Sequence, residues 1–120
     1  MRSFVFLFIL LLLSSPVIAE EADVVDVTVG ATGGNTYRFD VTVSHADEGW
    51  DHYADGWEVV APDGTVLATR KLAHPHVTEQ PFTRSLSGVT VPEGISKVTL
   101  RAHDSVHGYG GQEMSVELPR

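Results

Sequence analysis

Apolar and polar residues alternate with a period of two along most of this chain, and no stretch shows the period of a helix. Between Tyr37 and Ser44 every second residue is apolar, and the same alternation runs through 25–29, 98–102 and 114–118. This pattern is typical of strands with one buried face. It predicts antiparallel β-structure throughout.

Turn residues divide the alternating segments. Gly30 to Asn35, Pro62-Asp63-Gly64 and Pro92-Glu93-Gly94 supply glycine and proline where tight turns favour them. The expected strands are 22–29, 36–45, 55–61, 65–72, 82–87, 96–104 and 112–118. Seven short strands in roughly 100 residues predict an all-β protein, a seven-stranded immunoglobulin-like antiparallel β-sandwich. A small barrel is the alternative.

The first residues have the pattern of a secretory signal peptide. Arg2 precedes an unbroken apolar run from Phe4 to Leu13, and Val17-Ile18-Ala19 offers the residues that an export peptidase reads. The run is shorter than the roughly 20 residues of a membrane-spanning helix. We expect a signal peptide at 1–19 and a single domain at 20–120. An uncleaved anchor is the alternative. The expected location is periplasmic or secreted, with no membrane span after cleavage.

Composition excludes several classes of function. The 120 residues include 16 acidic and 8 basic side chains, a formal charge of −8. Nucleic acids and anionic membranes require a basic surface, so neither is an expected partner. The chain has no cysteine, which excludes disulfides, thiolate metal sites, iron–sulfur clusters and cysteine nucleophiles.

The six histidines occur only in, or next to, alternate connections between the expected strands. They are His45, His52, His74, His76, His103 and His107. Because consecutive antiparallel strands run in opposite directions, alternate connections lie at the same end of a sandwich. The strand count therefore predicts that all six histidines converge at one end of the domain.

This grouping predicts a metal site. His74-Pro75-His76 places two imidazoles on one side of an extended backbone, and His103 and His107 add a second pair. Imidazole ligands without thiolates suit copper(II) or zinc, with iron as a further option. By their loop positions, His76, His103 and His107 are expected to be better ligands than His45 and His52.

Carboxylates and aromatic residues accompany the histidines. Asp51, Glu79 and Asp104 are candidates to accept a ring N–H from a ligand or to bind the metal themselves. Four aromatic residues near the histidines could form an apolar collar that limits solvent access to the site: Trp50, Tyr53, Trp57 and Tyr109. Trp57, on the third expected strand, could equally be a core residue.

Two readings without metal stay open. His45 is in phase with the apolar face of its strand, so it could be a hydrogen-bonded core residue. The histidines together could form a pH-responsive surface, because imidazole becomes charged as the pH falls through about 6.5.

The chain resembles a family of small exported bacterial β-sandwich proteins in four segments: His45, Trp50-Asp51-His52-Tyr53, His74-Pro75-His76 and 101–110. A more distant similarity is to the iron-site domain of superoxide reductases. There a His-Pro segment supplies equatorial imidazoles, as His74-Pro75-His76 would here, and a second segment ends much like His107-Gly108. That second segment carries a cysteine thiolate, which this chain lacks, so the resemblance does not imply the activity.

The sequence thus predicts a periplasmic metal-binding protein that handles copper or zinc. The alternatives are a mononuclear histidine-ligated redox enzyme and a metal-free module that binds another envelope protein.

Overall fold

A computed structural model describes residues 21–119, and the expected signal peptide at 1–19 lies outside these residues. The described chain is all-β, as predicted. Its strands are β1 (Asp23–Gly33), β2 (Thr36–Ser44), β3 (Ala54–Val60), β4 (Val66–Lys71), β5 (Phe82–Thr90), β6 (Lys97–Asp104), β7 (Gly108–Tyr109) and β8 (Met114–Glu117).

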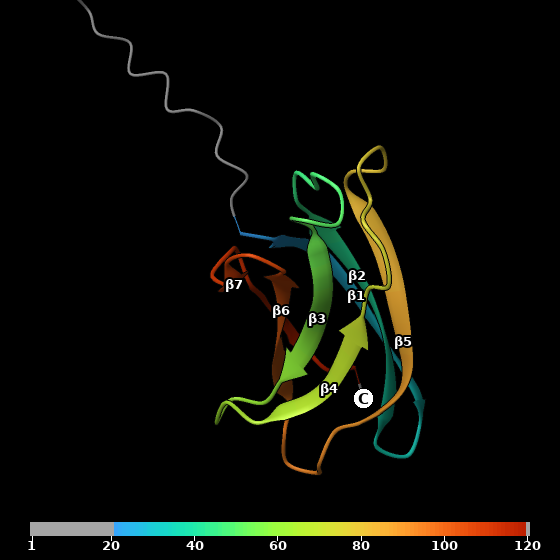
Figure 1. Ribbon diagram of the computed structural model, residues 1–120. Helices are drawn as coiled ribbons and strands as arrows, with labels where there is room; N and C mark the ends of the chain where they lie inside the picture. The colour runs from blue at the N-terminus through green and yellow to red at the C-terminus, as the bar shows by residue number, and fades with distance from the viewer. Residues whose placement is uncertain (1–20, 120) are drawn as a thin grey trace, which may run out of the picture.

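Two antiparallel sheets form a sandwich-like structure (Figure 1). One sheet has three strands in the order β1-β2-β5. The other has five strands, with β4, β3, β6 and β7 in order and β8 also paired to β6. Strand β3 is therefore central, because it pairs with β4 on one side and β6 on the other.

The strand expected at 112–118 is present as β8, but an additional short strand precedes it. A two-residue strand, β7, pairs with β6 through His103 and Tyr109, and β8 follows separately. Gly111 lies between them against Ala22, where an added Cβ would stand 2.1 Å from the Ala22 carbonyl oxygen. Only glycine permits so close a backbone approach, so the chain here is an interrupted strand.

The core lies between the two sheets and follows the alternation of the sequence. Phe39, Val41 and Val43 of β2 face Trp57 and Val59 of β3 in one buried cluster. The intervening residues of β2 are partly exposed. The predicted period of two is therefore confirmed in β2 as a division between core and surface. In β1 it is wrong at Val25, which is 41% exposed while Val24 is fully buried, because the pairing with β2 shifts register between Val24 and Asp26.

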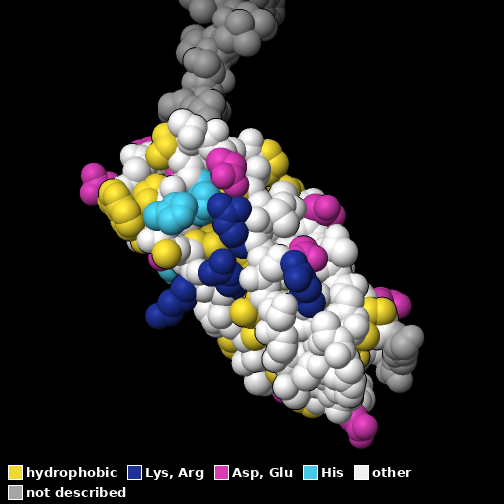
Figure 2. Space-filling model, turned by 90° about the vertical axis from the view of Figure 1, so that its right-hand side faces the viewer, with side chains coloured by type: hydrophobic (Ala, Val, Ile, Leu, Met, Phe, Trp, Pro, Cys, Tyr) yellow, Lys and Arg dark blue, Asp and Glu magenta, His cyan; other side chains and the backbone are white. Residues whose placement is uncertain are grey.

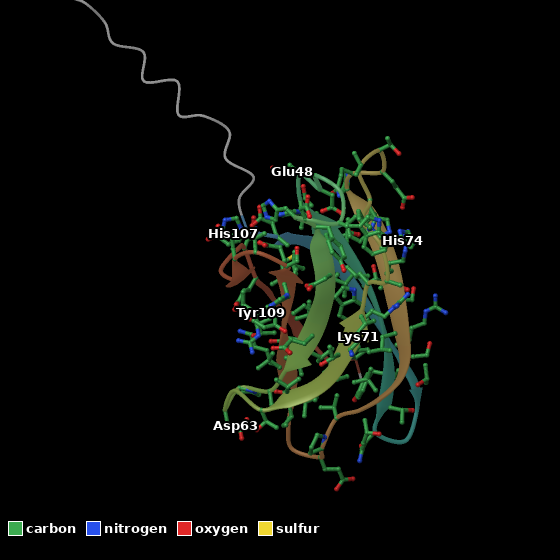
Figure 3. All side chains as sticks on the ribbon, in the orientation of Figure 1. Glu48, Asp63, Lys71, His74, His107 and Tyr109 are labelled. Atoms are coloured by element: carbon green, nitrogen blue, oxygen red, sulfur yellow. The ribbon has the colours of Figure 1, made fainter. Side chains whose placement is uncertain are left out.

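The connections after β2, β4 and β6 lie at one end of the molecule, and the turn after β3 lies at the other (Figure 3). Glu48, His74 and His107 mark the first end, and Asp63 marks the second. No helix within residues 21–119 is long and apolar enough to cross a membrane.

Candidate metal centre

A cluster of three histidines and two carboxylates lies inside the end formed by the β2–β3 and β6–β7 connections. His45 follows the last residue of β2, and Asp104 is the last residue of β6. His52 comes from the β2–β3 connection and His107 from the short β6–β7 connection. Segments far apart in the sequence therefore meet here.

Asp47 fixes the orientation of His45. Its Oδ1 accepts a hydrogen bond from His45 Nδ1 at 2.6 Å, and both side chains are fully buried. The backbone N–H groups of Ala54 and His76 also donate to Asp47, at 3.0 and 2.7 Å. Because a carboxylate can only accept, the neutral His45 ring carries its proton on Nδ1 and presents the Nε2 lone pair to the cluster.

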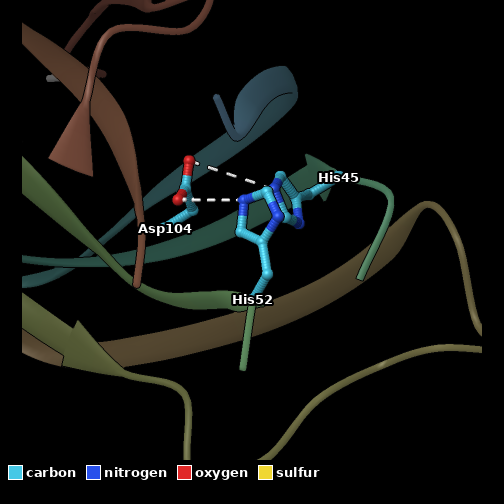
Figure 4. A group of neighbouring side chains, drawn as sticks. All are labelled: His45, His52 and Asp104. Carbon is cyan, nitrogen blue, oxygen red and sulfur yellow. Dashed lines mark hydrogen bonds and ion pairs between the residues drawn. The ribbon is translucent and has the colours of Figure 1, made fainter. Parts of the chain in front are cut away.

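The Nε2 atoms of His45 and His52 face each other at 3.2 Å (Figure 4). His52 Nε2 also lies 3.2 Å from Asp104 Oδ1, and His45 Nε2 lies 3.9 Å from Asp104 Oδ2. All three side chains are buried, and each offers a ligand atom within 4.8 Å of the others. The arrangement gathers two imidazole nitrogens and one carboxylate around a single point.

Asp104 is held as an ionised carboxylate. Its Oδ1 accepts hydrogen bonds from the backbone N–H groups of Val106 and His107, at 2.8 and 2.7 Å. Burial by itself would raise the pKa of Asp104, but these two hydrogen bonds and the nearby His107 ring bring the pKa below its ordinary value. The carboxylate is thus charged and fixed in position before any ligand binds.

His107 closes the cluster on its solvent side. Its Nδ1 lies 3.2 Å from Asp104 Oδ2, and its ring centroid is 4.9 Å from that of His52. The His107 side chain is 31% exposed, whereas those of His45 and Asp104 are fully buried. The cluster is therefore closed toward the core and accessible past His107.

The charge of this cluster favours a cation. Asp47 and Asp104 are both buried, and among residues 21–119 no lysine or arginine lies within ion-pair distance of either. Their only ion-pair partners are imidazoles. Buried charges are normally paired or bound to a metal, so a divalent cation or imidazole protons would neutralise them.

His74 and His76 lie in the β4–β5 connection and form a separate group. The His76 ring stacks on Phe82 with 4.0 Å between centroids, and its Nε2 accepts a hydrogen bond from Arg84 Nη2 at 2.9 Å. Burial, followed by the charge of Arg84, holds the pKa of His76 below its ordinary value. Figure 2 shows histidine side chains next to lysine or arginine side chains on the face of the molecule that it draws. His76 is therefore a neutral ring whose Nε2 lone pair is engaged.

His103 points to the outer face of the five-stranded sheet, away from the cluster. It alternates with the buried Ala102 and Asp104, and its Nδ1 donates to Asp55 at 2.5 Å. The structure thus brings His45, His52 and His107 together and leaves His74, His76 and His103 apart. Metal binding by the latter three stays a prediction.

The four aromatic residues do not form one collar. Trp57 is fully buried in the core, whereas Trp50 is 69% exposed and packs edge-on against Tyr53. Tyr109 lies on the outer face of the sheet beneath the Arg101 guanidinium. Burial, together with a hydrogen bond to Glu58, raises the pKa of Tyr109 to about 12, so this phenol stays protonated.

Three partners of the histidines were not assigned from the sequence: Asp47 for His45, Arg84 for His76 and Asp55 for His103. Asp47 could have been found, because it stands two residues after a histidine that follows the apolar face of a strand. Arg84 and Asp55 have no such signal, since Asp55 is brought to His103 by the pairing of β3 with β6, and Arg84 is brought to His76 by the path of the β4–β5 connection.

Comparisons with known proteins give one clear relative. Over 97 residues the chain is 50% identical to a protein of the haloarchaeon Halomicrobium mukohataei named "Putative lipoprotein", a match that covers 81% of this chain and 47% of that protein. No protein-family model matches the chain. No solved structure matches it either. The chain is therefore homologous to this archaeal protein and spans about half of its length.

Proposed function

We propose that this chain is an exported metal-binding protein whose site consists of His45, His52, Asp104 and His107. The observation that carries the proposal is the pair of Nε2 atoms 3.2 Å apart, both facing the buried carboxylate of Asp104. Ligand atoms of a tetrahedral site with bonds of 2.0–2.1 Å lie about 3.3 Å apart. The spacing of the imidazoles therefore suits a metal ion as well as it suits a hydrogen bond.

Three imidazoles and one carboxylate are donors that zinc and copper(II) both accept. Asp47 supports the proposal, because a ligating histidine normally donates its other ring N–H to a carboxylate or carbonyl. The accessible side past His107 would let an ion enter and leave. We therefore assign the site to copper or zinc handling.

Two finer assignments accompany this proposal. The strand orders β1-β2-β5 and β4-β3-β6-β7, with β8 also paired to β6, are consistent with an immunoglobulin-like sandwich. A periplasmic or secreted location follows from the pattern of the first 19 residues. The name of the archaeal relative supports export, because a lipoprotein is carried across the membrane before it is anchored.

A metal-free interaction module is the second candidate function. Among residues 21–119 the three most exposed large apolar residues are Trp50, Val77 and Val106, one from each of the three connections at the histidine end. Exposed apolar side chains that gather on one part of a surface mark contact sites for other proteins. Binding of another envelope protein at this end is compatible with, and independent of, metal binding.

The test is titration of chelator-treated protein with zinc(II) and copper(II) against a chromophoric competitor. His52→Gln should weaken binding at least about tenfold, because it removes one ligand. His74→Gln is the matched control, since His74 is exposed at the same end but lies outside the cluster, and it should bind like the wild type. Near-ultraviolet circular dichroism of the buried Trp57 reports whether each variant is folded. Wild-type protein that takes up neither ion, or equal affinity in both variants, would refute the site.

A further inference from the structure

A row of side chains crosses the outer face of the five-stranded sheet, away from the candidate metal centre. In the strand register, Gly56 of β3 stands opposite Lys71 of β4 on one side and His103 of β6 on the other. His103 in turn stands opposite Tyr109 of β7. The row therefore reads Lys71, Gly56, His103 and Tyr109 across four strands.

Gly56 leaves this row open in the middle. Two strand spacings, about 10 Å, separate Lys71 from His103, and no side chain stands between them. A Cβ at Gly56 would lie 3.2 Å from the Arg70 carbonyl oxygen, so a larger residue is disfavoured there. A groove of about 530 Å³ occupies this position, within the range of small-molecule sites.

A β-bulge directs Asp55 to the same face. The pairing of β3 with β6 shifts register between Ala54 and Gly56, which leaves Asp55 as the extra residue. Its carboxylate then accepts the 2.5 Å hydrogen bond from His103 Nδ1. Bulges that redirect a side chain are common beside functional sites. Here the bulge fixes the imidazole as one wall of the groove.

The other walls are mainly apolar or aromatic, and they include Tyr53, Leu72 and Tyr109. The Tyr109 ring meets the His103 ring edge-on with 4.8 Å between centroids, so the two rings form one continuous wall. The groove can therefore accept a flat or apolar group, with its polar atoms confined to a few positions.

Lys71 supplies the unbalanced charge. In the next row along β3 and β6, Arg101 Nε donates to Glu58 at 2.5 Å, so these two charges offset each other. The Asp55 carboxylate accepts the hydrogen bond from His103 Nδ1. Within residues 21–119, by contrast, the Lys71 ammonium has no carboxylate within ion-pair distance. The groove thus contains an ammonium group that is free to meet an anion, on a chain of net charge −8.

We propose that this groove binds a small organic carboxylate, with the carboxylate at Lys71 and the apolar part over Gly56 between the aromatic walls. A charge-assisted hydrogen bond from the ammonium would fix the anionic group. Because His103 Nδ1 donates to Asp55, the His103 Nε2 atom, which has no hydrogen-bond partner among the described residues, can accept a hydrogen bond from a donor group on the rest of the ligand. The site is separate from the candidate metal centre and does not depend on it.

The experiment is a ¹H–¹⁵N NMR titration of the full chain with sodium benzoate, without added metal. Benzoate should cause saturable shifts of the backbone amides of Gly56, Lys71 and His103. Benzamide, which has the same shape without the charge, should bind at least tenfold more weakly. Inorganic phosphate, which has charge without an apolar part, should also bind at least tenfold more weakly.

Lys71→Gln tests the charged group, and Lys97→Gln is its control. Both lysines are exposed, and Lys97 lies at the end of β6 that is far from His103 and the groove. Lys71→Gln should weaken benzoate binding at least tenfold, and Lys97→Gln should leave it unchanged. Absence of benzoate shifts at the groove, equal effects of the two substitutions, or equal affinity for phosphate would each overturn the proposal. None of these results would bear on metal uptake, which is measured separately.

Discussion

Asp47 is the residue on which the geometry of the candidate metal centre depends most. Asp47 is not itself a metal ligand in the proposed site, yet it connects three segments through hydrogen bonds from His45, Ala54 and His76. These contacts orient the His45 ring and select its tautomer. Carboxylates in this position commonly matter to metal affinity nearly as much as the ligands themselves.

Asp47→Asn should therefore weaken metal affinity by about 10- to 100-fold. An asparagine side chain can present its NH₂ to His45 Nδ1, so the ring would lose the contact that sets its tautomer. Competition titration with zinc(II) measures the effect. Asp51→Asn, an exposed change in the same connection, should have no effect, and equal losses in the two variants would show that only total charge matters.

His76 should make the stability of the fold depend on pH. Burial is the largest reason why the pKa of His76 lies below the ordinary 6.5. The charged and titratable groups that face its ring are Arg84, His74, Asp47 and Glu79. As the pH falls below about 6.5, the unfolded chain takes up a proton that the folded protein takes up only at lower pH. The free energy of unfolding contributed by this group therefore decreases with falling pH.

His76→Phe should flatten this dependence, because phenylalanine keeps the stacking on Phe82 and cannot be protonated. Urea denaturation at pH 7.5, 6.5 and 5.5 gives the free energy of unfolding of each variant. The advantage of wild type over His76→Phe should shrink as the pH falls. A difference that stays constant with pH would contradict the prediction.

At the scale of elements, β3 organises the five-stranded sheet. It carries the buried Trp57 toward the core and Gly56 toward the groove, and its first residues bring His52 and Asp55 into position. The strand is central because it pairs with β4 and β6 along nearly its whole length. One element thus contributes to the core, the metal centre and the groove.

Trp57→Ala should lower the free energy of unfolding by about 3–5 kcal/mol, the usual cost of a large aromatic cavity. Trp57→Phe should cost clearly less, because Trp57 Nε1 is buried without a hydrogen-bond partner among the described residues. Urea denaturation followed by far-ultraviolet circular dichroism measures both. Trp50→Ala, at a position 69% exposed, should change stability by less than about 0.5 kcal/mol. A large loss at Trp50 would place that ring in a packed environment instead.

At the scale of the whole molecule, metal binding should be coupled to folding and to protons. Metal that binds only the folded protein stabilises it, by about 2.7 kcal/mol at a hundredfold excess over the dissociation constant. Histidine ligands must be neutral to bind, and imidazoles near pKa 6.5 are protonated in mild acid. The increase in Tm caused by zinc should therefore be large at pH 7 and small at pH 5.

Differential scanning calorimetry with and without zinc at both pH values measures this coupling. A metal-free pH-responsive cluster would instead lower Tm between pH 7 and pH 5 whether or not zinc is present. Equal stabilisation by zinc at both pH values would indicate ligation by carboxylates such as Asp47, Glu48 and Asp51 rather than by histidines.

The sequence by itself determined the strands and their faces. The alternation along 37–44 and 98–102 predicted which residues are buried, because a strand presents successive side chains to opposite sides. The order of strands and turns predicted that the β2–β3, β4–β5 and β6–β7 connections share one end, since antiparallel strands reverse direction at each turn. Both are local properties of the chain, which is why a single sequence sufficed.

Only the tertiary structure decided which histidines meet. His45 and His52 converge with Asp104, although His76 and His103 were expected to be the better ligands; their Nε2 and Nδ1 atoms instead contact Arg84 and Asp55. Asp47 orients His45 from two residues away, but the orientation of His103 depends on Asp55, 48 residues away on another strand. The convergence of His45 and His52 with Asp104 likewise follows from register and packing between strands, and no local pattern in the sequence encodes it.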